Sequence, residues 1–335
     1  MILKLPLNNP QHTKILSLNH LARVLKEDKN VLLTIAQNAP RYYEPFDRFK
    51  KTEKDGTERW RHIDNPTGAL KEMQDRINKH ILPEIVKELP DYLAGGMPGR
   101  SIVRNAYPHI GKELIVGMDL EKCFENVGHE KIYAVWRGLG YGRDVASVLT
   151  QLTTLQNRLP QGSPASTILC NLALSGMAEE INTLAKSKGC DFTLYIDDVT
   201  VSGTKTATRS MISDIMACVK RADMKVNRTK THLAPSNRTQ DITGVNVNGS
   251  QSISNTKYQK VRIEIMALAS ETVPVNVRRY RSVWGKVHHV KYVDKKKGEK
   301  LEMLAKEKLL HLKTYDGPKL KNVRTRSCKS IRAKH

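Results

Sequence analysis

Two adjacent aspartates, Asp197 and Asp198, stand where a metal ion could be held. They fall between two short segments, residues 192–196 and 199–201, in which apolar and polar residues alternate. Such alternation is typical of half-buried strands and predicts a hairpin with both acids at its tight turn. An isolated Asp-Asp pair at a turn more often reflects turn formation, because Asp is a common turn residue.

A third acid, Asp119, changes that interpretation. It follows the apolar segment 113–118, which predicts a buried strand, and a carboxylate there is costly to bury unless it is paired or bound to metal. If this strand and the hairpin are neighbours in one sheet, the three acids meet at one end. Such oxygen ligands suit two Mg²⁺ ions, one to activate an attacking hydroxyl and one to neutralise a leaving pyrophosphate. The chemistry predicted is nucleotidyl transfer.

The charge of the chain predicts a polyanionic partner. The 335 residues carry a formal net charge of +22. Residues 286–335 contribute 16 Lys or Arg against 5 Asp or Glu, which is +11. Nucleic acid is the natural partner of such a chain, although an anionic membrane surface and simple solubility are alternatives. Charge alone does not separate DNA from RNA.

The composition indicates a globular protein of the cytoplasm. Hydrophobic residues make up 39%, and no apolar run approaches the roughly 20 residues of a membrane span. The first fourteen residues lack the apolar region of a signal peptide. The five cysteines, an odd number without a C-x-x-C pair, predict free buried thiols in a reducing compartment. The pair His288-His289 has no cysteine nearby, so no zinc site is expected.

The elements that must position the acids follow from periodicity. Alternation and turn residues predict hairpins over 41–63 and 191–203, and strand-like segments surround Val245 and Val247. This mixture indicates an α+β architecture. The tail from Lys319 has almost no apolar periodicity, and we expect a ligand to order it. Helical spacing recurs in residues 13–39 (two short helices ended by Pro40), 70–89, 129–155, 164–186, 207–223 and most of 257–315.

Three segments resemble the motifs of reverse transcriptases in order and spacing. Residues 118–124 (Met-Asp-Leu-Glu-Lys-Cys-Phe) resemble motif A, residues 159–164 (Leu-Pro-Gln-Gly-Ser-Pro) motif B, and residues 195–198 (Tyr-Ile-Asp-Asp) motif C. Residues 105–109 (Asn-Ala-Tyr-Pro-His) and 241–245 (Asp-Ile-Thr-Gly-Val) are similar to two elements of bacterial retron reverse transcriptases, with Ile where Val is usual in the second. The resemblance covers nearly the whole chain.

This resemblance implies a fold and an organisation. The fold would be α+β, a right-hand polymerase with fingers, a palm of antiparallel sheet and helices, and a helical thumb. Residues 1–92 would form the N-terminal helices and fingers, 93–247 the palm, and 248–335 the basic helical thumb and C-terminal tail.

The resemblance also implies an activity and partners. A retron reverse transcriptase is an RNA-directed DNA polymerase that uses Mg²⁺ and deoxynucleotides. It copies part of a cognate noncoding RNA from a guanosine 2′-hydroxyl into branched multicopy single-stranded DNA. A separately encoded effector and an antiphage role are implied, and no membrane partner. The alternatives are another bacterial defence or group II intron-like reverse transcriptase, or an inert RNA-binding scaffold, against which the intact acids argue.

Family motifs assign site residues by position. Asp119, Asp197, Asp198 and the backbone of Leu120 would hold metal. Phe124 would exclude a ribose 2′-hydroxyl, a core Phe being the alternative. The remaining candidates would contact substrate. Gln161 and Gly162 would line the nucleotide pocket, and Arg61 would bind the triphosphate, with a solvated surface arginine as the alternative. Lys71 matches the triphosphate role more loosely, and Lys230 would be a general acid, a phosphate contact or a solvated side chain.

RNA-binding candidates come from two regions. Asn105 and His109 belong to the first retron-like element, although a structural histidine is the more common role for such a residue. The basic helices after Tyr258 would follow the duplex backbone. Their candidates are Arg278, Arg279, Arg281 and Lys286, with Trp284 packing or stacking nearby.

Overall fold

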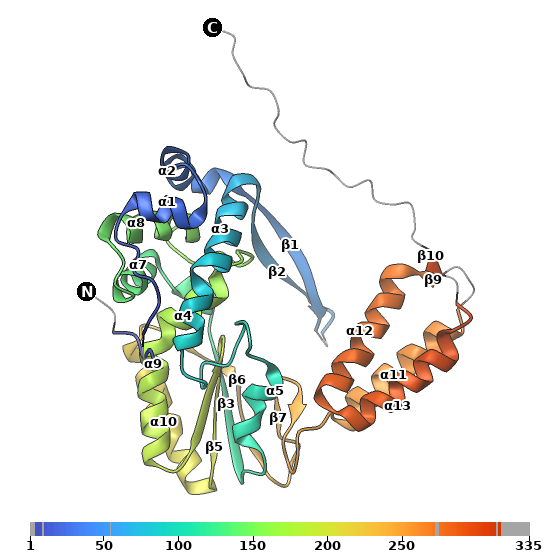
Figure 1. Cartoon of the computed structure of the whole chain (residues 1–335). Helices are drawn as coiled ribbons and strands as arrows, with labels where there is room; N and C mark the ends of the chain where they lie inside the picture. The colour runs from blue at the N-terminus through green and yellow to red at the C-terminus, as the bar shows by residue number, and fades with distance from the viewer. Residues whose placement is uncertain (1–3, 9, 54, 272–274, 313, 316–335) are drawn as a thin grey trace. The chain divides into compact units, whose positions relative to one another are not determined.

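A four-stranded antiparallel sheet carries the three acids. In the computed structural model its strands are β3 (Leu114–Leu120), β4 (Asp191–Tyr195), β5 (Asp198–Gly203) and β6 (Val226–Pro235), in the order β4-β5-β3-β6. The structure describes residues 4–8, 10–53, 55–271, 275–312 and 314–315. Within them, the expected α+β mixture of helices and antiparallel sheet is confirmed (Figure 1).

The chain divides into two compact units, Met1–Thr243 with Val247–Gly249, and Gly244–Asn246 with Ser250–His335. In the first unit, α9 (Ser166–Ser187) and α10 (Lys205–Arg221) pack on the sheet. The apolar residues of β3 explain this packing, since Leu114 to Met118 are all buried. A helix covering such a strand removes the apolar side chains from water.

Most of the remaining helices of the first unit build a second layer against the same core. Side chains such as Leu21, Leu32, Leu70 and Ile77 are fully buried in it. Ser17 and Asp28 cap the first two helices through side-chain oxygens. The elements are α1 (Leu18–Leu25), α2 (Lys29–Gln37), η1 (Ala39–Tyr42), α3 (Gly68–His80), α4 (Leu82–Glu88), α5 (Ile102–Ala106), η2 (Tyr107–His109), α6 (Cys123–Asn126), α7 (His129–Gly138) and α8 (Arg143–Thr153). Of these, α5 and η2 instead lie against β4.

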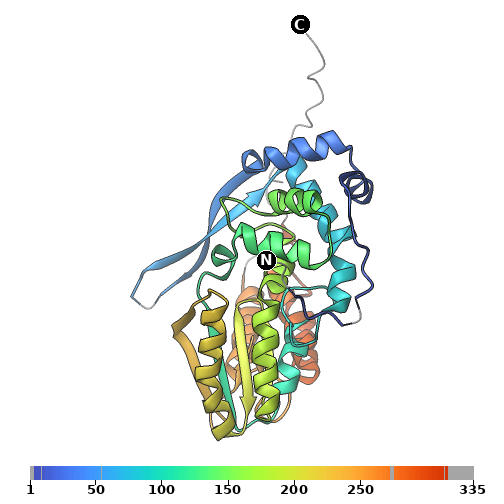
Figure 2. The ribbon, with the colours of Figure 1, turned by 90° about the vertical axis from the view of Figure 1, so that its left-hand side faces the viewer.

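A long hairpin, β1 (Tyr43–Thr52) and β2 (Glu58–Pro66), extends from this layer (Figure 2). Most of its residues are exposed at both strands. A short hairpin-like pair, β7 (Asp241–Ile242) and β8 (Val245–Asn246), follows β6.

Two helical predictions were only partly right. The helix expected over 70–89 breaks at Ile81, because Pro83 has no amide hydrogen and fits only the first turn of a new helix. The helix expected over 129–155 is two helices, since Gly140 adopts a left-handed φ of +81° between them. The prediction that most of 257–315 is helical is confirmed, and the described residues of this region hold three helices. The prediction about the tail from Lys319 lies outside the described residues.

The second unit is helical and is considered by itself. It contains α11 (Asn255–Ala269), α12 (Val277–Val293) and α13 (Lys295–Leu309), with a short parallel pair of β9 (Val275–Asn276) and β10 (Thr314–Tyr315). Its core includes Ile265, Val287 and Leu301. Gly298 lets α13 approach α12 closely, because a Cβ there would lie 2.1 Å from Lys291 Cα.

Two global properties of the described residues can be stated. No helix among them is both long and apolar enough to cross a membrane. Their four cysteines, Cys123, Cys170, Cys190 and Cys218, are free and buried, as expected.

Candidate active site

The three acids lie at one end of the sheet because their strands are neighbours. In the β3–β5 pairing, Asp119 lies opposite Asp198. Asp197 belongs to the turn before β5, and its carbonyl oxygen accepts a hydrogen bond of 2.8 Å from the amide of Leu120. One backbone contact thus joins the end of β3 to the turn.

The cluster of Asp119, Asp197 and Asp198 would be stabilised by added positive charge. Burial first, and then the charges of Asp197 and Asp119, raise the pKa of Asp198 to about 6. The pKa of Asp197 is also raised, by burial and by Asp119. Lys230 donates from Nζ to Asp119 Oδ1 at 2.7 Å and opposes both shifts.

Two observations bear on a metal ion. Within the described residues, no three His, Cys, Asp or Glu side chains are grouped closely enough to form a ready metal site. The donor set nonetheless fits a hard divalent cation, because the charges of neighbouring acids raise the pKa values of Asp197 and Asp198, while Lys230 pairs with Asp119.

The turn that carries Asp197 is held in an unusual shape. Ile196 has a φ of +63°, which β-branched residues rarely adopt. Gly95 lies directly against it, since a Cβ on Gly95 would be 2.4 Å from the amide nitrogen of Ile196. Asn171 donates to the carbonyl of Gly95 at 3.1 Å and so fixes the loop to α9. The loop and the turn therefore support each other.

A cleft of about 930 Å³ opens beside the acids. Its lining combines residues of the β1–β2 hairpin, of the segment after β3 and of the loop before α9. Asp198 lines a smaller adjoining cavity, and Lys71 on α3 is exposed and lines neither. The sequence-predicted residues that line the cleft are Asp119, Leu120, Asp197, Phe124, Gln161, Gly162, Arg61 and Lys230.

Gly162 occupies a place that no other residue could fill without a shift. Its φ is +133°, and an added Cβ would lie 2.8 Å from the carbonyl oxygen of Asp64. Asp64 also holds this loop by accepting from the amide of Gln161 at 3.2 Å and by pairing with Arg158 at 3.2 Å. Asp64 and Arg158 were not among the residues predicted from the sequence. In the sequence, Asp64 is only one acid in a polar segment. Its importance becomes visible only when its partner Arg158 is known.

Two hydroxyl groups of the cleft lack partners. The side-chain oxygens of Ser163 and Ser166 are buried and form no hydrogen bond with any residue that the structure describes, although both residues line the cleft. Buried hydroxyls without partners are uncommon, so a bound molecule is a natural acceptor or donor for them.

Asn105 and His109 are fully buried rather than exposed to a ligand. His109 contacts Ser202 Oγ at 2.6 Å and Thr193 Oγ1 at 2.9 Å, so it bridges β5 and β4. Burial lowers its pKa to about 4, which keeps the ring neutral. Asn105 donates to Thr243 Oγ1 at 3.3 Å and thereby joins the two retron-like elements. Direct RNA contact would require these side chains to leave the interior.

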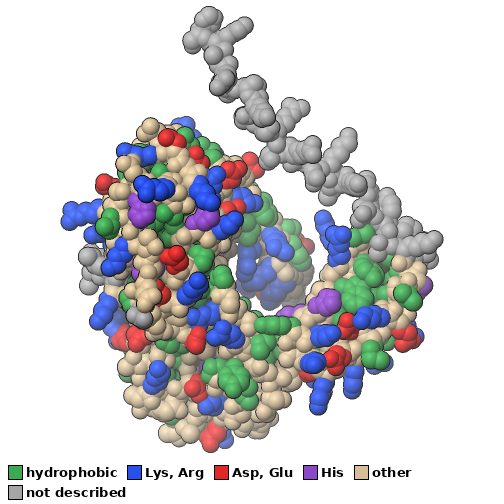
Figure 3. Space-filling view, viewed as in Figure 1, with side chains coloured by type: hydrophobic (Ala, Val, Ile, Leu, Met, Phe, Trp, Pro, Cys, Tyr) green, Lys and Arg blue, Asp and Glu red, His purple; other side chains and the backbone are tan. Residues whose placement is uncertain are grey.

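The basic candidates of the second unit lie on α12. Arg279 pairs with Glu271 and Lys286 with Glu264. Arg278 and Arg281 are exposed, and no ion pair joins them to a described residue. Trp284 lies between Tyr280 and His288, with ring centroids 6.3 and 5.7 Å away. Figure 3 shows Lys and Arg side chains beside hydrophobic ones over the helices of the second unit, α11 to α13.

Comparison with known proteins defines the class. The family described as reverse transcriptase (RNA-dependent DNA polymerase) matches residues 50–247, more than half of the chain. The retron Ec86 reverse transcriptase of Escherichia coli is 32% identical over 221 residues, 65% of this chain and 68% of that protein. The retron Se72 reverse transcriptase of Salmonella heidelberg is 27% identical over 249 residues, 71% of this chain and 64% of that protein.

The chain therefore belongs to the reverse transcriptase family and is of the bacterial retron type, an RNA-directed DNA polymerase by class. The match spans about two thirds of the length of these relatives. Among solved structures, a telomerase from Candida albicans in complex with a fragment of telomeric RNA is similar at a TM-score of 0.47 and 11% identity, over 89% of this chain and 62% of that one.

Proposed function

We propose that this chain copies part of a cognate noncoding RNA into branched multicopy single-stranded DNA. The observation that carries the proposal is the convergence of Asp119, Asp197 and Asp198 beside a cleft lined by Phe124 and Gly162. RNA would be the template, deoxynucleotides the substrates, and an RNA 2′-hydroxyl the primer. A separately encoded effector and an antiphage role complete the proposal.

The residues act in defined ways in this proposal. Two divalent cations, most simply Mg²⁺, would be held by the three carboxylates and the Leu120 carbonyl, and would supply activation of the hydroxyl and neutralisation of pyrophosphate. Phe124, which lines the cleft, would exclude a ribose 2′-hydroxyl by a clash with its ring. Arg61 offers a guanidinium to phosphate oxygens, and Lys230 can supply a proton to the leaving group.

The larger regions have proposed roles as well. Residues 1–92 would serve as fingers, 93–247 as palm and 248–335 as thumb and tail. On the thumb, Arg278 and Arg281 would contact the phosphate backbone.

Two measurements test this function. Purified protein should extend a primer on an RNA template with deoxynucleotides and a divalent cation, and Asp197→Asn should lower the rate by at least about 10³-fold, because a ligand and a charge are lost. Normal extension by this variant would contradict the mechanism. Lys79→Gln, at an exposed position on α3, is the control and should leave extension unchanged.

Priming is tested separately. Expression of the gene with its flanking DNA should yield a short, abundant, RNase-sensitive RNA–DNA species with a branch. If primer extension works but this species is absent, the enzyme is a reverse transcriptase of another kind.

A further inference from the structure

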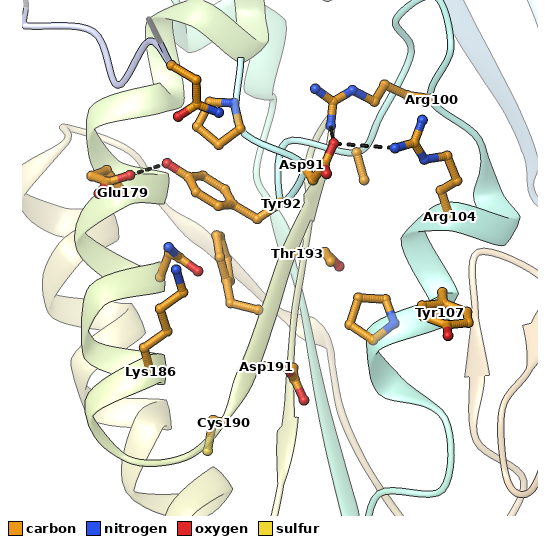
Figure 4. A pocket seen from close by; sticks show the side chains of 16 residues that line it. Asp91, Tyr92, Arg100, Arg104, Tyr107, Glu179, Lys186, Cys190, Asp191 and Thr193 are labelled. Atoms are coloured by element: carbon orange, nitrogen blue, oxygen red, sulfur yellow. Dashed lines mark hydrogen bonds and ion pairs between the residues drawn. The ribbon is translucent and has the colours of Figure 1, made fainter. Parts of the chain in front are cut away.

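A second pocket, of about 570 Å³, opens beside β4, the edge strand of the sheet. It shares no lining residue with the cleft. Figure 4 shows it between α9, which contributes Glu179 and Lys186, and the α5 region, which contributes Arg104 and Tyr107. Nothing in the proposed polymerase chemistry uses this pocket, which we name the β4 pocket.

The outer edge of β4 is only partly paired. Leu194 donates to the carbonyl of Tyr92 at 2.7 Å and accepts from the amide of Ala94 at 2.8 Å. Residues two apart in a strand direct their N–H and C=O groups to the same side, so Phe192 presents both groups to this edge. Among the described residues the pairing on this side is limited to Leu93 and Leu194. Phe192 lines the β4 pocket and therefore offers it a free backbone donor and acceptor.

The side-chain amide of Asn182 also provides a hydrogen-bond donor and an acceptor to this pocket. Asn182 lines the β4 pocket, is only 7% exposed, and has no side-chain hydrogen bond to any described residue. Its amide is not among the sealed side-chain groups that lack a partner, so water or a ligand in the pocket can pair with it. Its donor and acceptor match a peptide group.

The charges around the pocket favour a peptide over a nucleic acid. Arg100 and Arg104 both contact Asp91, at 2.7 and 3.4 Å. Glu179 accepts from the hydroxyl of Tyr92, as Figure 4 shows. Asp191, a third carboxylate of the lining, pairs with Lys112 at 2.6 Å. The lining sets Asp91, Glu179 and Asp191 against Arg100, Arg104 and Lys186, so it has no net positive charge to attract a polyanionic chain.

One cation of the lining is left for a ligand. Lys186 is exposed, and no ion pair joins it to a residue in the described part of the chain. Beside it, the rings of Tyr92 and Phe192 pack with centroids 5.7 Å apart and form an apolar wall.

We propose that the β4 pocket binds an extended acidic peptide segment of a protein partner, which adds as a strand to β4 at Phe192. The segment hydrogen-bonds to the Phe192 backbone and to the Asn182 amide. One of its carboxylates pairs with Lys186, and a neighbouring apolar side chain lies against Tyr92. Main-chain hydrogen bonds give such strand addition its affinity, and the side-chain contacts give it specificity. Because β4 runs directly into the turn of Asp197, the partner would be seated next to the catalytic hairpin.

A library of random linear peptides on phage, selected against the full chain, supplies the probe. Selected peptides should share an acidic, extended consensus. A synthetic peptide of that consensus should bind Asn182→Leu and Lys186→Glu at least about tenfold more weakly than the wild type. Binding should also slow hydrogen exchange at the Phe192 amide. Lys79→Glu, an exposed charge reversal on α3, is the matched control and should bind within about twofold of the wild type.

Controls in the same experiment show whether a loss of binding comes from misfolding or from the changed charge. Each variant should keep the thermal midpoint and the primer-extension rate of the wild type. If Asn182→Leu does not fold, Lys186→Glu carries the test alone, and a peptide with Lys in place of its acid should regain binding to it.

Three outcomes would overturn the proposal. The first is that no selected peptide depends on Lys186 and Asn182. The second is that the same substitutions weaken binding of a ten-residue oligouridylate, which would make the pocket a nucleic-acid site. The third is a wild-type dimer in sedimentation that Lys186→Glu dissociates, which would make a second copy of the chain the occupant.

Discussion

Several residues of this site are packed so closely against backbone that a larger side chain would not fit. Gly162 and Gly95 each lie against the backbone of another segment, at Asp64 and Ile196, where a side chain would have no room. Phe124 is half-buried and lines the cleft, so its ring is partly fixed by the core and partly available to a substrate. Specificity and geometry at this scale therefore depend on the volume of particular side chains.

Phe124→Val should relax the choice of sugar. Removal of the ring opens space for a 2′-hydroxyl, so the efficiency of ribonucleotide relative to deoxynucleotide incorporation should rise about 10- to 100-fold. Single-nucleotide primer extension measures this ratio. Phe46→Val, on β1 and outside the cleft lining, should leave the ratio unchanged. An unchanged ratio in Phe124→Val would show that this ring is only a core residue.

Gly162→Ala should destabilise the chain and slow extension. The new Cβ would lie 2.8 Å from the Asp64 carbonyl at a φ of +133°, so the loop must move, at a cost of about 1–3 kcal/mol in unfolding free energy. Urea denaturation measures this cost. Gly176→Ala in α9, where nothing lies within 4 Å of the added Cβ, should instead stabilise by up to about 1 kcal/mol. Equal effects of the two changes on the unfolding free energy would show that lack of room for a Cβ at Gly162 is not what destabilises the variant.

At the scale of elements, the catalytic hairpin is supported from two sides. The loop with Gly95 lies against its turn, and His109 bridges its two strands through hydroxyl groups. Asn105, four residues earlier, contacts Thr243 where the chain leaves the first unit. The short helical segment 102–109 thus connects the hairpin with the end of that unit.

His109 gives stability a definite pH dependence. Its folded pKa of about 4 lies below the unfolded value near 6.5, so the unfolded chain binds more protons between these values and stability falls as pH falls through this window. Between pH 7 and pH 5 the wild type should lose about 2 kcal/mol more than His109→Gln, which does not titrate there. Urea denaturation at both pH values measures the difference. Parallel losses in the two proteins would indicate that His109 is charged when folded.

The sequence predicted those parts of the site that local patterns mark. The apolar strand marked Asp119, the resemblance to the family added Gln161 and Arg61, and the structure brings all three to the cleft. Asp64 was missed because its partner Gln161 lies 97 positions away and no local pattern records such a contact. Lys71 was included on sequence position alone, and α3 directs it elsewhere.

At the scale of the whole molecule, charge is the dominant feature. The net charge of +22 sets a strong attraction to nucleic acid, but many of the individual cations are already paired. Composition predicted a polyanionic partner, but it could not distinguish arginines in ion pairs from arginines outside them. That distinction depends on which acids the helices bring near them.

The salt dependence of binding should reveal the difference. Replacement of Arg278 and Arg281 together by Gln should lower the slope of log K against log salt for an RNA–DNA duplex by about 1–2, because each phosphate contact releases close to one counterion. Arg279→Gln, whose guanidinium pairs with Glu271, should change the slope by less than about 0.5. Filter binding across a salt series measures both. Equal slopes in the wild type and the double variant would remove α12 from the interface.

The left-handed Ile196 has a consequence for the thermodynamics of metal binding. Such a conformation persists only where the surroundings impose it, and here Gly95 and the Leu120–Asp197 backbone contact do so. The backbone of the turn that carries Asp197 is thus held in place by the protein interior before an ion arrives, and within the described residues only the acidic side chains remain to be gathered into a metal site. Cation binding then requires no local folding, and we expect its heat capacity change to be small compared with that of a site that orders on binding.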